Sequence, residues 1–304
     1  MTKSQNFNLL GFVSIIFAMF IWGSSFIALK AAMADLGEFT VIFFRMLIAS
    51  LCFIYFIKDF LKYDFTKKDI QLIILFAFFE PCLYFVFEAK ALLYTSASQA
   101  GMITSLMPIL TAMAAGYFLK EIISKQLLFG SLIAVFGAIW LSVQATSTVT
   151  SPNPLLGNFL EFCAMICAAG YTIVVRYLVS KFSAIFITAM QAFIGAIFFF
   201  PFFIYEFSTT DMNFTTNAVA CLFYLGVVVT LGGYGLYNFA LTKIDASKAS
   251  MFIYLIPIFT MILAFFILDE KLTALELIAS AVILTGVALS QLKFKKLKKR
   301  KHYS

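Results

Sequence analysis

The chain has 304 residues, of which 62% are hydrophobic and only 12% are charged. Soluble domains are about half apolar and about a quarter charged, so this composition excludes a soluble globular fold and indicates a protein surrounded by lipid. Much of the formal net charge of +7 lies in a basic run from Lys293 to Lys301. Such a run can bind nucleic acid in a soluble protein, but directly after an apolar helix we expect it to contact anionic lipid.

Ten segments are apolar and long enough to cross a membrane as helices, which takes about 20 residues each. Their approximate ranges are 9–30, 39–57, 70–92, 97–118, 126–144, 157–177, 183–205, 215–240, 248–268 and 273–292. The first run is of span length and more spans follow it, so we interpret it as a retained helix rather than a signal peptide. The connections are short and leave no room for a separate soluble domain.

Basic residues in the connections predict the orientation of the spans, because cytoplasmic loops are enriched in Lys and Arg. With the N-terminus inside, the outer connections hold mainly acids, although Lys30, Lys90 and Lys271 are exceptions. The inner connections then hold Lys58, Lys62, Lys67, Lys68, Lys120, Lys125, Lys181, Lys243 and Lys248. We therefore expect a multi-pass protein of a bacterial inner membrane with both termini in the cytoplasm.

The chain also repeats itself. Residues 97–121 align without gaps with residues 246–270, and the matching positions include Pro, Ser, Thr and Glu as well as apolar residues. We expect a first five-helix repeat over 9–144, a second over 155–292, and a basic cytoplasmic tail over 293–304. An odd number of spans in each repeat requires opposite insertion of the two, which is typical of transporters. The predicted fold is an all-α membrane protein of ten transmembrane helices, built as two inverted five-helix repeats around a central cavity.

Four groups of residues carry a further likeness: WGSSF at 22–26, FFR at 43–45, ALLYTSASQAG at 91–101, and the Pro108 and Glu121 pattern with its copy at Pro257 and Glu270. Together they resemble the ten-helix, EamA-type branch of the drug/metabolite transporter superfamily, over nearly the whole chain. The resemblance implies alternating-access transport of a small organic solute such as an amino acid, a metabolite or a drug-like compound. Export is common in the family, and members that resemble this chain include importers.

Ionisable side chains inside a membrane are costly and are therefore candidates for function. Glu80, Tyr84 and Glu88 are spaced four apart in the third span and share one helix face. Arg45 in the second span is expected at the depth of Glu88, so we predict an Arg45–Glu88 ion pair that either locks the fold or takes part in transport. Glu80 is expected without a basic partner. It is then a protonatable coupling site, a cation ligand, or a permanently protonated carboxyl.

The second half carries no charge at the matching places, where Gln191, Val229 and Tyr237 stand for Arg45, Glu80 and Glu88. We therefore expect an asymmetric central cavity with neutral polar and aromatic contacts, unless these side chains serve packing or membrane-interface anchoring instead. The candidates from the second half are Tyr171, Gln191, Tyr234, Tyr237, Asn238 and Tyr254. The candidates from the first half are Trp22, Ser25, Thr104 and Ser105.

Two further patterns concern helix shape. Pro108 and Pro257 occupy equivalent places in the fourth and ninth spans and are hinge or gate candidates, with static packing kinks as the alternative. The glycines of LGGYG at 231–235 lie inside a span, where they favour close helix packing or bending over phosphate binding.

The leading function is a secondary transporter that moves a small organic solute across the inner membrane, with export preferred over import of a metabolite or vitamin-like compound. The chain has no Walker motif, and its single histidine is His302 in the tail, so neither direct ATP coupling nor enzymatic catalysis is expected. The alternatives from other classes are an intramembrane enzyme and a non-transporting membrane subunit, which are less favoured because the sequence shows no catalytic cluster and the loops are short. We expect no cofactor, no metal and no nucleic-acid partner, and either a monomer or a homodimer.

Overall fold

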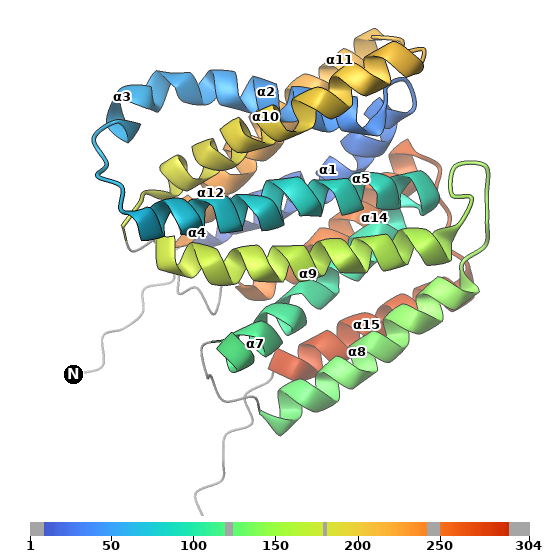
Figure 1. Ribbon diagram of the computed structural model, residues 1–304. Coiled ribbons are helices and arrows are strands. Elements are labelled where there is room, and N and C mark those ends of the chain that lie inside the picture. The colour runs from blue at the N-terminus through green and yellow to red at the C-terminus, as the bar shows by residue number, and fades with distance from the viewer. Residues whose placement is uncertain (1–8, 119–123, 179–180, 242–249, 292–304) are drawn as a thin grey trace, which may run out of the picture.

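The computed structural model describes residues 9–118, 124–178, 181–241 and 250–291. These residues form a bundle of helices without a β-sheet, which confirms the predicted all-α class (Figure 1). The basic tail, Glu121 and most of the connection between the eighth and ninth predicted spans lie outside the described residues.

The first half begins with α1 (Leu9–Met33) and α2 (Glu38–Phe53), which leads through a short turn into α3 (Ile57–Phe60). A broken third span follows, made of α4 (Lys67–Ala77), a wide helical turn at Phe78–Leu83, and α5 (Tyr84–Tyr94). The half closes with α6 (Ala97–Ile103), a tight turn at Thr104–Leu106, α7 (Met107–Phe118) and α8 (Lys125–Gln144).

The second half follows the same order. It begins with α9 (Pro154–Leu178) and α10 (Ala184–Thr209), and its broken third span consists of α11 (Thr216–Phe223), a wide turn at Tyr224–Gly233, and α12 (Tyr234–Leu241). It closes with a tight turn at Ser250–Tyr254, α14 (Leu255–Ile267) and α15 (Ala274–Gln291). Among the described residues, eight helical stretches are long and apolar enough to span a membrane, and two shorter apolar helices at Phe252–Ile267 and Ala274–Ser290 stand for the ninth and tenth predicted spans.

The repeat seen in the sequence reappears in the places where helices depart from α geometry. The wide turns at Phe78–Leu83 and Tyr224–Gly233 interrupt the third span of each half, and the tight turns at Thr104–Leu106 and Ser250–Tyr254 interrupt the fourth. Discontinuous helices at matching places of two inverted repeats are the best structural pointer to a transporter binding site. These breaks therefore direct attention to the middle of the bundle.

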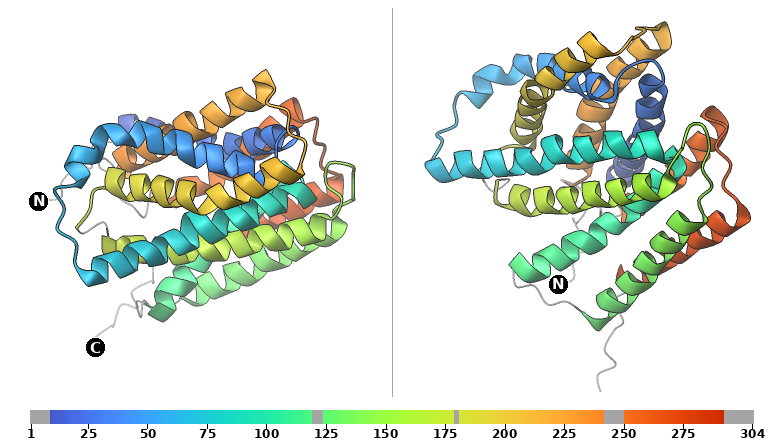
Figure 2. Two further views of the ribbon diagram at one scale, coloured as in Figure 1. Left: turned by 45° about the horizontal axis from the view of Figure 1, so that its top comes forward. Right: turned by 45° about the vertical axis from the view of Figure 1, so that its right-hand side comes forward.

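The two halves interlock instead of forming separate bodies. Helix α8 packs on α15, α2 on α10, α5 on α9, and α1 on α14, so each of these pairs joins the first half to the second. The views in Figures 1 and 2 show α8 and α15 as an antiparallel pair at one side of the bundle. Glycine permits this close approach, since a Cβ atom on Gly286 would lie 2.8 Å from the carbonyl oxygen of Gly130.

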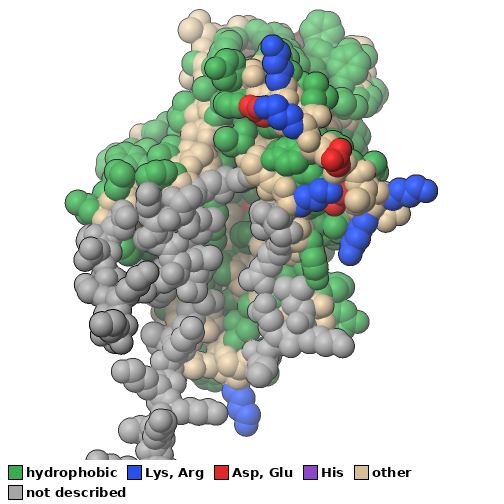
Figure 3. Space-filling view, turned by 90° about the vertical axis from the view of Figure 1, so that its left-hand side faces the viewer, with side chains coloured by type: hydrophobic (Ala, Val, Ile, Leu, Met, Phe, Trp, Pro, Cys, Tyr) green, Lys and Arg blue, Asp and Glu red, His purple; other side chains and the backbone are tan. Residues whose placement is uncertain are grey.

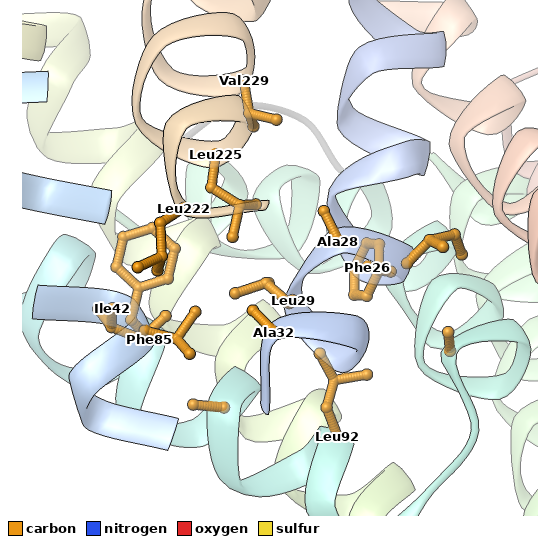
Figure 4. Packing of buried hydrophobic residues seen from close by; sticks show 14 of the residues in the cluster. Phe26, Ala28, Leu29, Ala32, Ile42, Phe85, Leu92, Leu222, Leu225 and Val229 are labelled. Carbon is orange, nitrogen blue, oxygen red and sulfur yellow. The ribbon is translucent and has the colours of Figure 1, made fainter. Parts of the chain in front are cut away.

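The largest apolar core lies between α1, α2, α5 and the α11 region. Leu29 and Ile42 pack there with Phe85 and Leu225, and each of these side chains is buried (Figure 4). Val229, which stands in the second half where Glu80 stands in the first, is completely buried in the same core. The two halves therefore use equivalent positions differently, one for apolar packing and the other for a carboxyl group.

The two ends of the bundle carry different loops. The connection between α3 and α4 lies at one end, and the connection Ala145–Asn153 lies at the opposite end (Figure 1). Seen onto the first of these ends, the surface shows several Lys and Arg side chains between apolar groups (Figure 3). We refer to it as the basic end and to the other as the acidic end, which holds Asp35, Glu38, Glu206, Asp269 and Glu270.

Candidate transport site

The break in the third span places Glu80 in the middle of the bundle. Its backbone angles, φ −148° and ψ 116°, are extended and not helical. The following residue, Pro81, has no N–H group to continue the helical hydrogen bonds. The Glu80 side chain is nevertheless only 7% exposed, so the broken helix presents a carboxyl group to the protein interior.

Glu80 is held by two neutral donors from the other half of the chain. The side-chain amide of Gln191 in α10 donates to Oε1 of Glu80 at 2.8 Å, and the Tyr234 hydroxyl at the start of α12 donates to the same oxygen at 3.0 Å. Arg45 interacts with Glu80 electrostatically, without a direct contact. The structure thus brings together three of the predicted site residues and joins the two repeats through them.

The predicted Arg45–Glu88 ion pair is wrong as a direct contact. No nitrogen of Arg45 lies within 4.0 Å of a carboxylate oxygen in the described part of the chain. Instead, the Arg45 guanidinium lies over the ring of Phe85 at 4.6 Å from its centroid. Glu88 accepts a hydrogen bond of 2.7 Å from Tyr84, four residues earlier on the same face. The two charges still interact electrostatically, because both are buried.

Aromatic side chains stand beside Glu80. The Trp22 ring lies 5.2 Å from the Tyr234 ring and 5.2 Å from the Tyr237 ring, measured between centroids. Gly233 makes room for this group, since a Cβ atom there would lie 2.6 Å from Nε1 of Trp22. Tyr171 in α9 interacts electrostatically with both Glu80 and Tyr237 and therefore lies near the same group.

The remaining predicted residues have other surroundings. The hydroxyl groups of Ser25, Thr104 and Ser105 each donate to the backbone carbonyl three residues earlier in their own helix. Tyr254 packs against a second apolar core that contains Met102 and Ile283. The side chain of Asn238 lies outside the described residues.

The two hinge candidates have equivalent settings. Pro108 is the second residue of α7 and Pro257 the third residue of α14, and each follows a tight helical turn. A proline in the first turn of a helix removes a backbone donor that has no partner there anyway. The prolines therefore mark where the fourth span of each half changes geometry, and their role as hinges stays a prediction.

Sequence reasoning missed a further buried carboxyl group, Glu161 in α9. Its side chain is 0% exposed, and neither of its oxygens accepts a hydrogen bond from a described residue. It also missed a polar network one turn away, in which Asn158 donates to Gln99 at 2.7 Å and Gln99 donates to Glu276 at 2.8 Å. The signal was available, because Glu161 is an acid within a predicted span.

The acidic end is closed by contacts between the halves. Glu270 of the second half accepts hydrogen bonds from the backbone N–H groups of Ala97 and Ser98, both at 2.9 Å, at the beginning of α6. Glu206 in α10 accepts hydrogen bonds from the backbone of Phe39 at 3.1 Å and Thr40 at 2.8 Å, at the beginning of α2. A carboxylate at a helix N-terminus satisfies donors that have no partner within the helix. These contacts fasten the halves together at this end.

Glu80 itself is buried, whereas the aromatic side chains around it are only partly buried. A hollow of about 580 Å³ lies at the acidic end and is lined by Glu38, Phe39, Lys90, Pro201, Phe202, Tyr205, Glu206, Thr209 and Thr210. A smaller hollow of about 310 Å³ lies near Ser98 and Glu270. None of the predicted site residues lines either one. Within the described residues, no group of three or more His, Cys, Asp or Glu side chains is placed to hold a metal ion.

The chain has sequence relatives across bacteria, archaea and plants. It is 29% identical to a protein of Bacillus subtilis described as the uncharacterized transporter YetK, over 93% of this chain and 87% of the relative. An uncharacterized transporter of Archaeoglobus fulgidus is 26% identical over 90% of this chain and 95% of its own length. A WAT1-related chloroplastic protein of Arabidopsis thaliana is 28% identical over 90% of this chain and 68% of its own length.

The fold is also that of a solved crystal structure. That structure superimposes with a TM-score of 0.61 at 16% identity, over 93% of this chain and 95% of the other. Residues 9–143 and 155–292 each match the EamA-like transporter family, which lies in the drug/metabolite transporter superfamily. The chain is therefore a multi-pass membrane protein that belongs to the EamA-like transporter family.

Proposed function

We propose that this protein is a secondary transporter that exports a small organic solute from the cytoplasm by alternating access, with Glu80 at the centre of its binding site. The observation that carries the proposal is the position of Glu80 at a helix break in mid-span, hydrogen-bonded to Gln191 and Tyr234 of the opposite repeat. Import of a metabolite or vitamin-like compound is the alternative direction.

The contacts of Glu80 suit a site that works by moving one repeat against the other. Both of its donors belong to the second half, so a rocking motion of the halves would break these two hydrogen bonds and free the carboxyl group for a ligand. In the present conformation the contacts of Glu206 and Glu270 hold the acidic end closed. This arrangement supports a site that would open first toward the basic end.

The chemistry around Glu80 favours a solute with an amino group. Glu80, Glu88 and Glu161 are buried carboxyl groups, whereas Arg45 is the only buried base near them in the described residues. The rings of Trp22 and Tyr234 offer aromatic faces beside Glu80, and such faces attract cations. Amino acids and amine-containing metabolites or drugs fit this combination.

Proton antiport follows from the same chemistry. A buried carboxyl group can be neutralised either by a proton or by the cationic end of a solute, and binding of one excludes the other. Protons entering from outside would then displace the solute and drive its export. The orientation that fits this cycle places the basic end in the cytoplasm, with both termini on that side and the basic tail near anionic lipid.

Transport into proteoliposomes tests the proposal. The purified protein is reconstituted, and a panel of radiolabelled amino acids and amine-containing compounds is offered to vesicles with and without an imposed pH gradient. We expect saturable uptake of at least one compound when the vesicle interior is acidic, because proton efflux then drives solute entry. Uptake that is independent of the gradient would overturn proton coupling, and binding without uptake would overturn transport itself.

A further inference from the structure

Two helices that pack on each other, α5 and α9, each bring a buried carboxyl group to their interface. We propose that Glu88 and Glu161 form a carboxyl pair that binds one proton, as a second proton site beside Glu80. The proposal deepens the proposed function because it assigns a coupling proton to a place that no sequence motif indicates. The occupancy of the pair can nevertheless be measured without transport.

Glu161 has the surroundings of a neutral carboxylic acid. Its side chain is 0% exposed, and neither oxygen accepts a hydrogen bond from any described residue. A buried carboxylate without donors is far more costly than a buried carboxylic acid, because nothing replaces the lost hydration of its charge. In this arrangement the proton belongs on Glu161.

Glu88 has the surroundings of the ionised partner. Its Oε1 accepts the hydrogen bond from Tyr84 at 2.7 Å, and the positive charge of Arg45 acts on it across the interior. Its other oxygen, Oε2, is buried and accepts nothing from the described residues. Because α5 packs on α9 and both side chains are buried, ionising Glu88 and Glu161 together would leave two repelling charges in one interior region, so the proposed pair holds one proton.

The charge balance of the interior also supports one proton on the Glu88–Glu161 pair. Three carboxyl groups, Glu80, Glu88 and Glu161, lie near one buried base, Arg45, and Tyr84 interacts electrostatically with all three acids. One carboxylate is balanced by Arg45, so electrical neutrality requires two protons or one proton and one cationic solute. In the proposal, Glu80 binds either a proton or the cationic solute, and the Glu88–Glu161 pair binds the remaining proton.

One turn from Glu161 along α9, Asn158 belongs to a polar network that also contains a buried acid, Glu276, which accepts a hydrogen bond from Gln99. Helices α6 and α8 offer Gln99 and Ser142, which are both engaged by Asn158, and α9 itself adds Cys163, Cys167 and Tyr171. A metal ion does not fit the pair, since the described residues contain no group of three or more His, Cys, Asp or Glu side chains placed to hold one. Complete burial of Glu161 also keeps a solute away from it in this conformation.

Infrared spectroscopy of the reconstituted full-length protein tests the pair directly, because a carboxylic acid and a carboxylate absorb at different frequencies. Spectra are recorded in H₂O and D₂O over a range of pH for the wild type and for Glu161→Gln, Glu88→Gln and Glu206→Gln. We expect Glu161→Gln to lose a carboxylic-acid band that the other two variants keep. Glu206 is the matched control, since it is buried but accepts backbone hydrogen bonds.

A spectrum of Glu161→Gln with the full set of carboxylic-acid bands would overturn the pair. If that variant does not fold, Glu161→Leu serves instead, because an apolar side chain suits the site of a neutral acid. The same vesicles separate this inference from the proposed function. If Glu161→Gln loses the band but the wild type shows no proton-driven transport, the pair stands and the proposed proton coupling is overturned. If the wild type shows proton-driven transport but Glu161→Gln keeps every band, the coupling stands and the pair is overturned.

Discussion

Two sets of carboxyl groups in this protein have opposite surroundings. At the acidic end, Glu206 and Glu270 accept hydrogen bonds from the first residues of helices in the opposite half. In the middle of the bundle, Glu161 accepts none from the described residues and Glu88 accepts one. Carboxylates of the first kind are anchors, because their charge is stabilised by hydrogen bonds from backbone N–H groups. Those of the second kind are suited to gain and lose a proton.

Removal of an anchor should have the largest effect on stability. Glu206→Ala leaves the backbone N–H groups of Phe39 and Thr40 without an acceptor, and it leaves the Thr40 hydroxyl only the sulfur of Met212. Hydrogen bonds to charged groups contribute about 1.5–3 kcal/mol each, so we expect a loss on the order of 3 kcal/mol. Thermal unfolding of the detergent-solubilised protein measures this loss of stability. An unchanged unfolding midpoint would show that Glu206 does not anchor the two halves.

Neutralisation of a mid-membrane carboxyl group should instead affect transport. Glu80→Gln keeps the size of the side chain and removes the group that a proton or an amine would neutralise. We expect gradient-driven transport to fall at least about tenfold, which corresponds to about 1.4 kcal/mol, while the thermal midpoint stays near that of the wild type. Full gradient-driven activity in this variant would show that Glu80 carries no coupling proton.

The glycines near Trp22 offer a smaller, paired test of the aromatic group. A Cβ at Gly233 would lie 2.6 Å from Nε1 of Trp22, whereas a Cβ at Gly235 meets nothing within 4 Å. Gly233→Ala should therefore displace the indole and weaken solute affinity roughly threefold to tenfold, about 1 kcal/mol. Gly235→Ala is the matched control and should bind as the wild type does. Equal affinities in titrations of the two variants would exclude Trp22 from the site.

Removal of a surface ion pair at the basic end should have the smallest effect on stability and transport. Lys181 donates to Asp69 at 2.6 Å, but the Lys181 side chain is 38% exposed. Exposed pairs of this kind add little to stability because water and salt screen them. Lys181→Gln should leave both the thermal midpoint and the transport rate unchanged. A clear loss of either would show that this end also carries anchors.

Hydropathy predicted the ten spans because it depends on residues that lie close together in the sequence, and the internal repeat predicted their division into two sets of five. The site was harder to predict. Glu80, Gln191 and Tyr234 were all candidates, but their contact depends on how the two halves pack, and no local pattern records that. The depth estimate that paired Arg45 with Glu88 assumed straight helices, whereas the third span is interrupted at Glu80.

Glu161 was overlooked for a related reason. Glu161 lies within the predicted sixth span, 157–177, but its burial depends on how α9 packs against α5, and no local pattern records that. In the structure α9 already begins at Pro154, so Glu161 lies two turns inside the helix and is fully buried against α5. The packing of the two halves therefore reveals a candidate proton site that the sequence analysis did not single out.

Simultaneous measurement of solute and proton movement tests the central claim most directly. Proteoliposomes that contain a pH-sensitive dye are given a solute identified in the transport panel, with no imposed gradient. The account predicts that solute entry makes the vesicle interior more alkaline in the wild type and in Glu206→Gln, and that Glu80→Gln shows no such change. Solute entry in the wild type without any change in internal pH would contradict it.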